Sequence, residues 1–171
     1  MRADGEFPDF YAANYGRIVA LVTSLLGDRS EAEDVAQEAF ARALLRWSRL
    51  RTYDLPEAWI RRVALRLATD SRRRAGRMSR LARLTAAGPP SSQPDVAVVL
   101  DLSEAILALP FSVRQVVVLH YLVDLPVAQI ASELRLPPST VKTRLASGRR
   151  RLERKLSGQR EVVRGEGGDA R

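Results

Sequence analysis

The sequence has no cysteine and a single histidine, His120, among its 171 residues. Disulfide frameworks, thiol nucleophiles, iron–sulfur clusters and cysteine-based zinc sites are therefore excluded. One imidazole cannot form a His-rich metal centre or a two-histidine catalytic device, and acidic residues are dense only at Glu33, Asp34 and Glu38. We therefore expect no enzymatic activity, no catalytic residue, no metal site and no cofactor.

Long apolar runs are also missing. No run approaches the roughly 20 apolar residues that a membrane-spanning helix needs. The first ten residues, MRADGEFPDF, contain neither the basic segment nor the apolar segment of a secretory signal. These features predict a cytoplasmic protein that does not insert into a membrane.

Positive charge is abundant but unevenly distributed. The chain has 28 Lys and Arg against 20 Asp and Glu, a net charge of +8. Residues 51–88 contain ten basic and three acidic side chains, and residues 138–157 contain seven basic and one acidic. Two dense cationic segments separated by more acidic ones favour two contacts with one polyanion, because each contact releases counterions from phosphates. An arginine-rich composition without a nucleic-acid partner is the alternative interpretation.

Glycine and proline divide the chain into segments with helical periodicity, and no alternation of period two indicates a strand. We therefore predict an all-α protein with two small helical domains, the second a helix-turn-helix. A segment rich in Pro, Ser and Gly separates them as a flexible linker. The expected boundaries are a first domain at 1–78, a linker at 79–100, a second domain at 101–157 and a disordered tail at 158–171.

Three helices are expected in the first domain. The first spans 7–26 and ends at Gly27. The second begins with a capping box formed by Ser30 and Glu33 and continues in three–four spacing to Trp47. The third begins near Pro56 and ends at about residue 77.

The third helix has two different faces. At 100° per residue, its apolar face is formed by Ile60, Val63, Ala64 and Leu67. Arginines lie on the opposite face, and few acids accompany them, which favours phosphate binding over a solvated surface. Trp59 lies at the border, where its ring either covers the core or stacks on a base. The arginines of this face are Arg62, Arg66 and Arg73.

The second domain contains the pattern of a helix-turn-helix. Residues 126–134 form a short amphipathic helix, 135–137 a tight connection, and Pro138 opens a longer helix. Polar and cationic side chains in the first turns of that longer helix are of the types that bind phosphates and guanine acceptors in the major groove. The candidate DNA-binding residues are Ser139, Thr140, Lys142, Thr143, Arg144 and, farther along, Arg149.

Together these motifs resemble extracytoplasmic-function (ECF) sigma factors, a group of the sigma-70 family of bacterial transcription initiation factors. The resemblance covers about residues 7–157. It rests on D-R-S-E-A-E-D-V-A-Q-E-A-F at 28–40, on L-P-E-A-W-I-R-R-V-A-L-R-L-A-T-D-S-R-R-R at 55–74, and on two motifs of the second domain. Those two are L-P-x-x-x-R at 109–114 and V-A-Q-I-A-x-x-L followed by S-T-V-K-T-R-L.

The resemblance implies binding to core RNA polymerase and to promoter DNA, and it allows an anti-sigma factor as a further partner. It assigns polymerase binding to Glu33, Asp34, Gln37 and Glu38. It assigns recognition and melting of the minus-10 element to Arg49, Arg51, Trp59, Arg62, Arg66 and Arg73, with a flipped base captured by the loop 49–54. It assigns the minus-35 element to the helix-turn-helix residues. A stand-alone helix-turn-helix regulator, whose first domain mediates dimerisation or sensing, is the alternative function.

Overall fold

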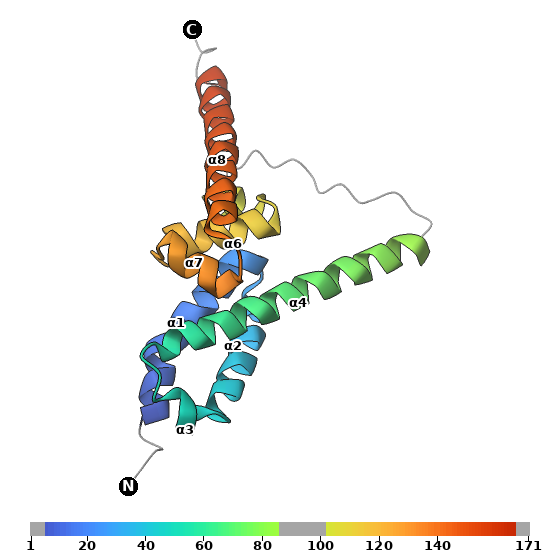
Figure 1. The fold of residues 1–171 in the computed structure, drawn as a ribbon. Coiled ribbons are helices and arrows are strands. Elements are labelled where there is room, and N and C mark those ends of the chain that lie inside the picture. Colours follow the sequence, from blue (N-terminus) through green and yellow to red (C-terminus); the bar gives the residue numbers. More distant parts are fainter. Residues whose placement is uncertain (1–5, 86–101, 167–171) are drawn as a thin grey trace. The chain divides into compact units, whose positions relative to one another are not determined.

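The computed structural model describes residues 6–85 and 102–166, with side chains described for 6–79 and 102–157. Every regular element in those ranges is a helix, which confirms the predicted all-α class (Figure 1). The chain divides into two compact units between residues 96 and 97. We call them the amino-terminal unit and the carboxy-terminal unit.

Four helices form the amino-terminal unit: α1 (Glu6–Leu26), α2 (Arg29–Leu44), α3 (Trp47–Leu50) and α4 (Pro56–Thr85). The three long helices α1, α2 and α4 pack against one another. Their shared core is made of aliphatic and alanine side chains, and the small alanines of α2 allow close approach of its neighbours. Its most buried members include Val22, Leu25, Ala32, Ala36, Ala39, Ile60 and Ala64.

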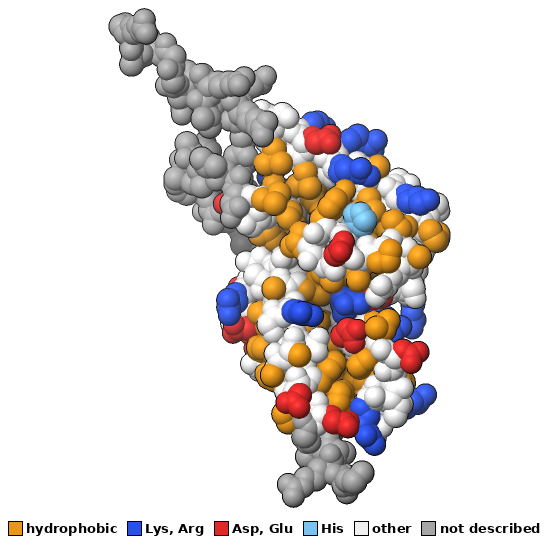
Figure 2. Space-filling model, turned by 90° about the vertical axis from the view of Figure 1, so that its left-hand side faces the viewer, with side chains coloured by type: hydrophobic (Ala, Val, Ile, Leu, Met, Phe, Trp, Pro, Cys, Tyr) orange, Lys and Arg blue, Asp and Glu red, His pale blue; other side chains and the backbone are white. Residues whose placement is uncertain are grey.

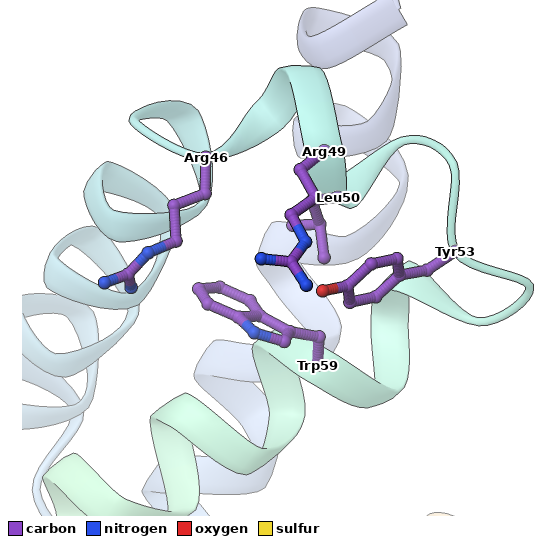
Figure 3. Close-up of a pocket in the computed structure, with 5 residues that line it drawn as sticks. All are labelled: Arg46, Arg49, Leu50, Tyr53 and Trp59. Carbon is purple, nitrogen blue, oxygen red and sulfur yellow. The ribbon is translucent and has the colours of Figure 1, made fainter.

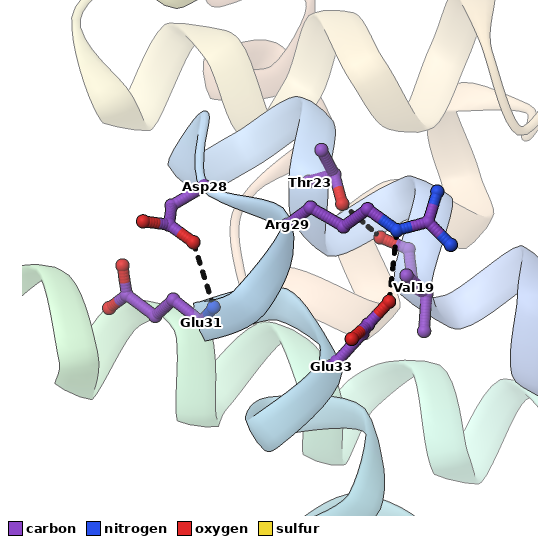
Figure 4. A network of polar contacts seen from close by, with 6 residues as sticks. All are labelled: Val19, Thr23, Asp28, Arg29, Glu31 and Glu33. Carbon is purple, nitrogen blue, oxygen red and sulfur yellow. Dashed lines mark hydrogen bonds and ion pairs between the residues drawn. The ribbon is translucent and has the colours of Figure 1, made fainter.

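The turn between α1 and α2 fixes where the second helix begins. Gly27 has a left-handed φ of 82°, and it ends α1. Asp28 is extended and accepts a hydrogen bond of 2.9 Å from the amide of Glu31 (Figure 4). The predicted capping box of Ser30 and Glu33 is therefore wrong, because the chain reverses earlier and α2 starts two residues sooner than that pattern requires.

An aromatic cluster joins α1 to the end of α2 and to α3. The Trp47 ring lies 5.2 Å from Phe7 and 5.0 Å from Phe10, and the Tyr11 ring lies 4.8 Å from Phe40. Trp47 does not continue the second helix as predicted, because α2 ends at Leu44 and a turn precedes α3. That turn lets the indole pack back against α1, which the straight helix would not allow.

The helix α4 is longer than predicted, and its buried face is rotated from the predicted one. Val63 and Leu67 are only half-buried, whereas Ala58, Leu65 and Ala68 are buried, because α4 packs against α1 and α2 together. The hydroxyl of Ser71 also donates a hydrogen bond to the carboxylate of Glu31 on α2. The helix continues to Thr85 and so includes the first seven residues of the expected linker; the others lie outside the described residues.

The carboxy-terminal unit contains α5 (Leu102–Leu107), α6 (Phe111–Tyr121), α7 (Val127–Leu134) and α8 (Pro138–Glu166). The helix α8 packs on α6 and α7. The buried guanidinium of Arg114 donates hydrogen bonds to the carbonyl oxygens of Leu107 and Leu109, the latter at 3.0 Å. Arg114 thereby satisfies carbonyl groups at the end of α5 and holds this helix on α6.

The last helix extends beyond the expected end of the second domain. The helix α8 runs on to Glu166, into the segment 158–171 for which disorder is expected. Gly158 alone does not end the helix, because glycine costs only about 1 kcal/mol relative to alanine and strong helix formers surround it. Residues 167–171 lie outside the described residues.

Hydrophobic side chains also reach the surface. On the face that Figure 2 shows, they are scattered among acidic and basic side chains. Within the described ranges, no helix combines the length and the apolar character that crossing a bilayer requires.

Close contact between α6 and α8 depends on a glycine. A Cβ atom added at Gly148 would overlap Cγ2 of Val117 and lie 3.2 Å from Cγ1 of Val113. These valines belong to the buried cluster against which Leu152 also packs. Gly148 therefore sets the distance between the two helices.

We predict that Gly148→Ala destabilises the protein by about 1 to 3 kcal/mol, the usual cost of overpacking a core. Gly76→Ala is the matched control, because nothing lies within 4 Å of its added Cβ. That substitution should stabilise α4 by up to about 1 kcal/mol. Urea unfolding followed by circular dichroism measures both. Equal stability of the two variants would contradict the role of Gly148.

Candidate nucleic-acid interface

The helix-turn-helix consists of α7, a three-residue connection and the first half of α8. Ile130 and Val141 are completely buried between the helices, Leu145 is almost completely buried, and Leu134 is half-buried. Pro126 precedes α7 in an extended conformation and provides no side-chain cap. The shared apolar contact therefore holds the two helices together, and it determines which side of α8 faces outward.

The connection between α7 and α8 is closed by a Schellman motif. The amide of Leu136 donates to the carbonyl of Ala131 at 2.9 Å, and the amide of Arg135 donates to that of Ser132. Arg135 is left-handed, with φ 54° and ψ 48°. A residue with a Cβ is strained there, because glycine is the residue that adopts this conformation without cost.

The first turns of α8 gather the predicted minus-35 residues on one end of one helix. Ser139, Lys142 and Thr143 are exposed, whereas Thr140 and Arg144 are half-buried. The hydroxyl of Thr143 donates to the Ser139 carbonyl at 3.0 Å. Arg149, two turns farther along, is exposed among other arginines. The start of α8 therefore presents hydroxyls and cations to any ligand that approaches its amino terminus.

The predicted arginine face of α4 is exposed along its length. Arg62, Arg66 and Arg73 all lie on the side opposite the buried alanines. The Nε of Arg62 donates to the carbonyl of Ala58 at 3.1 Å, which leaves the rest of its guanidinium outward. Arg73 lies 4.0 Å from Asp70, and both side chains are more than half exposed, so this ion pair is weak.

A pocket of about 220 Å³ lies beside this face, where α3 and the following loop meet the start of α4 (Figure 3). The rings of Trp59 and Tyr53 and the guanidinium groups of Arg46 and Arg49 converge on it. Arg49 and Trp59 were predicted site residues, and the structure brings them together. Arg51 does not line the pocket; it lies 3.4 Å from Glu6 of α1 in an ion pair.

Of the five pocket residues, Arg46, Leu50 and Tyr53 were not singled out from the sequence, although Leu50 and Tyr53 lie in the loop 49–54 that was expected to capture a base. Arg46 belongs to the turn that interrupts the predicted second helix, so its position depended on a helix end that the periodicity did not show. An aromatic residue within an arginine-rich loop was the available signal for Tyr53. The pocket combines π faces and cations, which suits an unpaired base and its phosphate.

The acidic face of α2 lies on its outer side. Asp34, Gln37 and Glu38 are exposed, and Glu33 is half-buried. Glu33 pairs with Arg29 at 2.9 Å and Glu38 pairs with Arg42 at 2.7 Å, each one helical turn away. Exposed pairs of this kind contribute little stability, so the acids remain available to a partner. Among the described residues, no three His, Asp or Glu side chains are grouped as metal ligands.

Two protein-family models match the chain, one in each unit. Sigma-70 region 2 matches residues 10–78, and Sigma-70, region 4 matches residues 99–152. The protein is thus of the sigma-70 class. Matches in both halves favour this class over a stand-alone helix-turn-helix regulator.

Relatives narrow the class. The chain is 32% identical over 170 residues to the ECF RNA polymerase sigma factor SigW of Bacillus subtilis, covering 88% of each chain. It also matches the solved structure of sigma factor RpoE in complex with the anti-sigma factor NepR from Bartonella quintana, with a TM-score of 0.70 and 20% identity over 89% of this chain and 97% of that one. The structure of CnrH with the cytosolic domain of CnrY gives a TM-score of 0.60 and 25% identity, covering 91% and 92%.

The chain belongs to the ECF sigma factors. Proteins of this family bind core RNA polymerase and direct promoter-specific initiation of transcription; they are initiation factors rather than enzymes. The two units correspond to the two conserved regions of such a factor.

The strained turn of the helix-turn-helix generates a prediction. Arg135→Gly should stabilise the carboxy-terminal unit by about 0.5 to 1 kcal/mol, because glycine relieves the left-handed strain but is more flexible when unfolded. Arg149→Gly, in a helical and exposed position, should destabilise α8 by about 1 kcal/mol. Thermal unfolding of both variants separates the two effects, and a lower melting temperature for Arg135→Gly would contradict the strain.

Proposed function

We propose that this sigma factor attaches to core RNA polymerase through the outer face of α2, and that Asp34, Gln37 and Glu38 make the central contacts. Their spacing of three and one residues places them together on the exposed side. Glu38 lies more than two turns from the start of α2, so the helix dipole does not explain its charge. Glu33 extends the same face towards the amino end.

The helix-turn-helix reads the minus-35 element in this proposal. Ser139, Thr140 and Thr143 bind phosphates through their hydroxyl groups, which fixes the register of the unit on the duplex. Lys142 and Arg144 are long enough to reach guanine acceptors in the major groove, and each good base contact contributes about 1 to 3 kcal/mol of discrimination. Arg149 binds the backbone farther along α8.

The amino-terminal unit opens the minus-10 element. An extruded base is held in the pocket lined by Trp59, Tyr53, Arg46 and Arg49. This pocket is the main support for strand opening by the amino-terminal unit. Stacking on the rings returns about 1 to 3 kcal/mol per base, which offsets the loss of stacking in the duplex. Arg62, Arg66 and Arg73 of α4 hold the adjacent backbone, whereas Arg51 is paired with Glu6 outside the pocket.

The protein itself makes and breaks no covalent bonds in this account, because polymerase supplies the catalytic site. It works in the cytoplasm, with the transcription machinery. An anti-sigma factor is a further partner, since the structure of the RpoE relative contains one.

Transcription in vitro tests the proposed function, with genomic fragments as templates and with the purified protein and core polymerase. The absence of a specific transcript from every fragment would refute the proposed function.

Reversing the charge of the α2 face tests the docking assignment. Asp34→Lys with Glu38→Lys should weaken binding to core polymerase by on the order of 100-fold, because like charges across an interface cost several kcal/mol. Asp9→Lys is the control, since Asp9 is exposed on another helix. Fluorescence anisotropy of labelled variants measures the affinity. If the double variant binds as tightly as the control, α2 is not the docking face.

Trimming the indole tests the pocket. Trp59→Ala should weaken binding of the polymerase complex to minus-10 single-stranded DNA by about 5- to 100-fold, the value of one stacked base. Trp59→Phe keeps a ring and should retain most of the affinity, provided stacking is the cause. Equal losses in both variants would instead indicate a packing role. Melting curves of the free proteins identify any variant that is unfolded.

A further inference from the structure

The outer side of α4 carries one straight row of side chains that extends beyond the residues assigned above. Steps of three and four residues keep successive members within a narrow arc of the helix, because 3.6 residues complete a turn. The row begins at the pocket and ends near the last described side chains of α4. Its members are Trp59, Arg62, Arg66, Asp70, Arg73 and Arg77.

The distal part of the row does not contribute to the core. Ala68 is the last buried residue of α4 among those with described side chains, and residues 72–79 are all exposed. That segment contains four arginines and no acid, so repulsion between neighbouring cations opposes the helix. A polyanion bound along the row would offset this repulsion.

The length of the row defines what it can reach. Arg77 lies eighteen positions after Trp59, which corresponds to about 27 Å at 1.5 Å per residue. Along the axis of a duplex, each strand has one phosphate about every 3.4 Å, so a row parallel to that axis reaches across about eight base pairs.

Residues 72–79 include no aromatic side chain, so this end offers no ring on which an unpaired base could stack. Its chemistry suits the backbone of paired DNA rather than an unpaired strand. We propose that Arg77 binds a backbone phosphate of duplex DNA about eight base pairs from the base held at Trp59, on the side that stays paired. This inference rests on the proposed opening of the minus-10 element. It adds a second, sequence-independent contact to the same helix.

Salt dependence of promoter binding tests this contact. Arg77→Gln in the polymerase complex should reduce the slope of log K against log salt by about 0.9, the value for one phosphate contact on duplex DNA. Arg72→Gln is the matched control: it removes the same charge from the same exposed segment, about 140° around the helix from Arg77. The control should keep the wild-type slope.

A second DNA locates the contact. On a promoter fragment whose paired segment ends within four base pairs of the captured base, Arg77→Gln and the wild type should bind equally. Three results would each overturn the proposal. The first is an equal salt slope for Arg77→Gln and the wild type on full-length DNA, and the second is an equal decrease of that slope in Arg77→Gln and Arg72→Gln. The third is weaker binding of Arg77→Gln than of the wild type to the short fragment. If the wild-type complex binds promoter DNA no better than other DNA, the proposed function is wrong. That result differs from all three above, so failure of the proposed function can be told apart from failure of the Arg77 contact.

Discussion

Burial of one side of α4 against α1 and α2 is the contact on which the arginine face and the pocket of the amino-terminal unit depend. Because Ala58, Ala64 and Ala68 must face the core, Arg62 and Arg66 must face outward, and the same constraint directs Trp59 towards the pocket. The alanines also bring α4 close to its neighbours, so the helix is rigidly held before DNA arrives. The side chains of a site on a packed helix are already positioned, so little conformational entropy is lost when the ligand binds.

In the carboxy-terminal unit, burial of one side of a helix also turns its polar side chains outward, but other helices make the contact. Val141 and Leu145 bury one side of α8 against α7, and Gly148 allows α6 to approach on the next turn. The hydroxyl and cationic side chains at the start of α8 are therefore exposed as a group. In both units an apolar contact between helices orients a cationic surface.

Periodicity predicted the long helices well, because core-facing residues repeat with the period of the helix itself. It predicted helix ends poorly. Asp28 rather than Ser30 caps α2, and the turn before Trp47 was missed, because such ends depend on how the chain packs afterwards. The pocket was predicted in part: Trp59, Arg49 and the loop that contains Tyr53 were named, but Arg46 joins them only through that turn.

The sequence alone determined the helical class, the division into two helical units, the family and the outward placement of most charged candidates, because these follow from local pattern and composition. Tertiary structure decided which arginines share a site. Arg51 pairs with Glu6 whereas Arg46 enters the pocket, and residues far apart along the chain set that difference. Local sequence patterns do not predict contacts between distant residues, because each such contact depends on the angle at which whole helices cross.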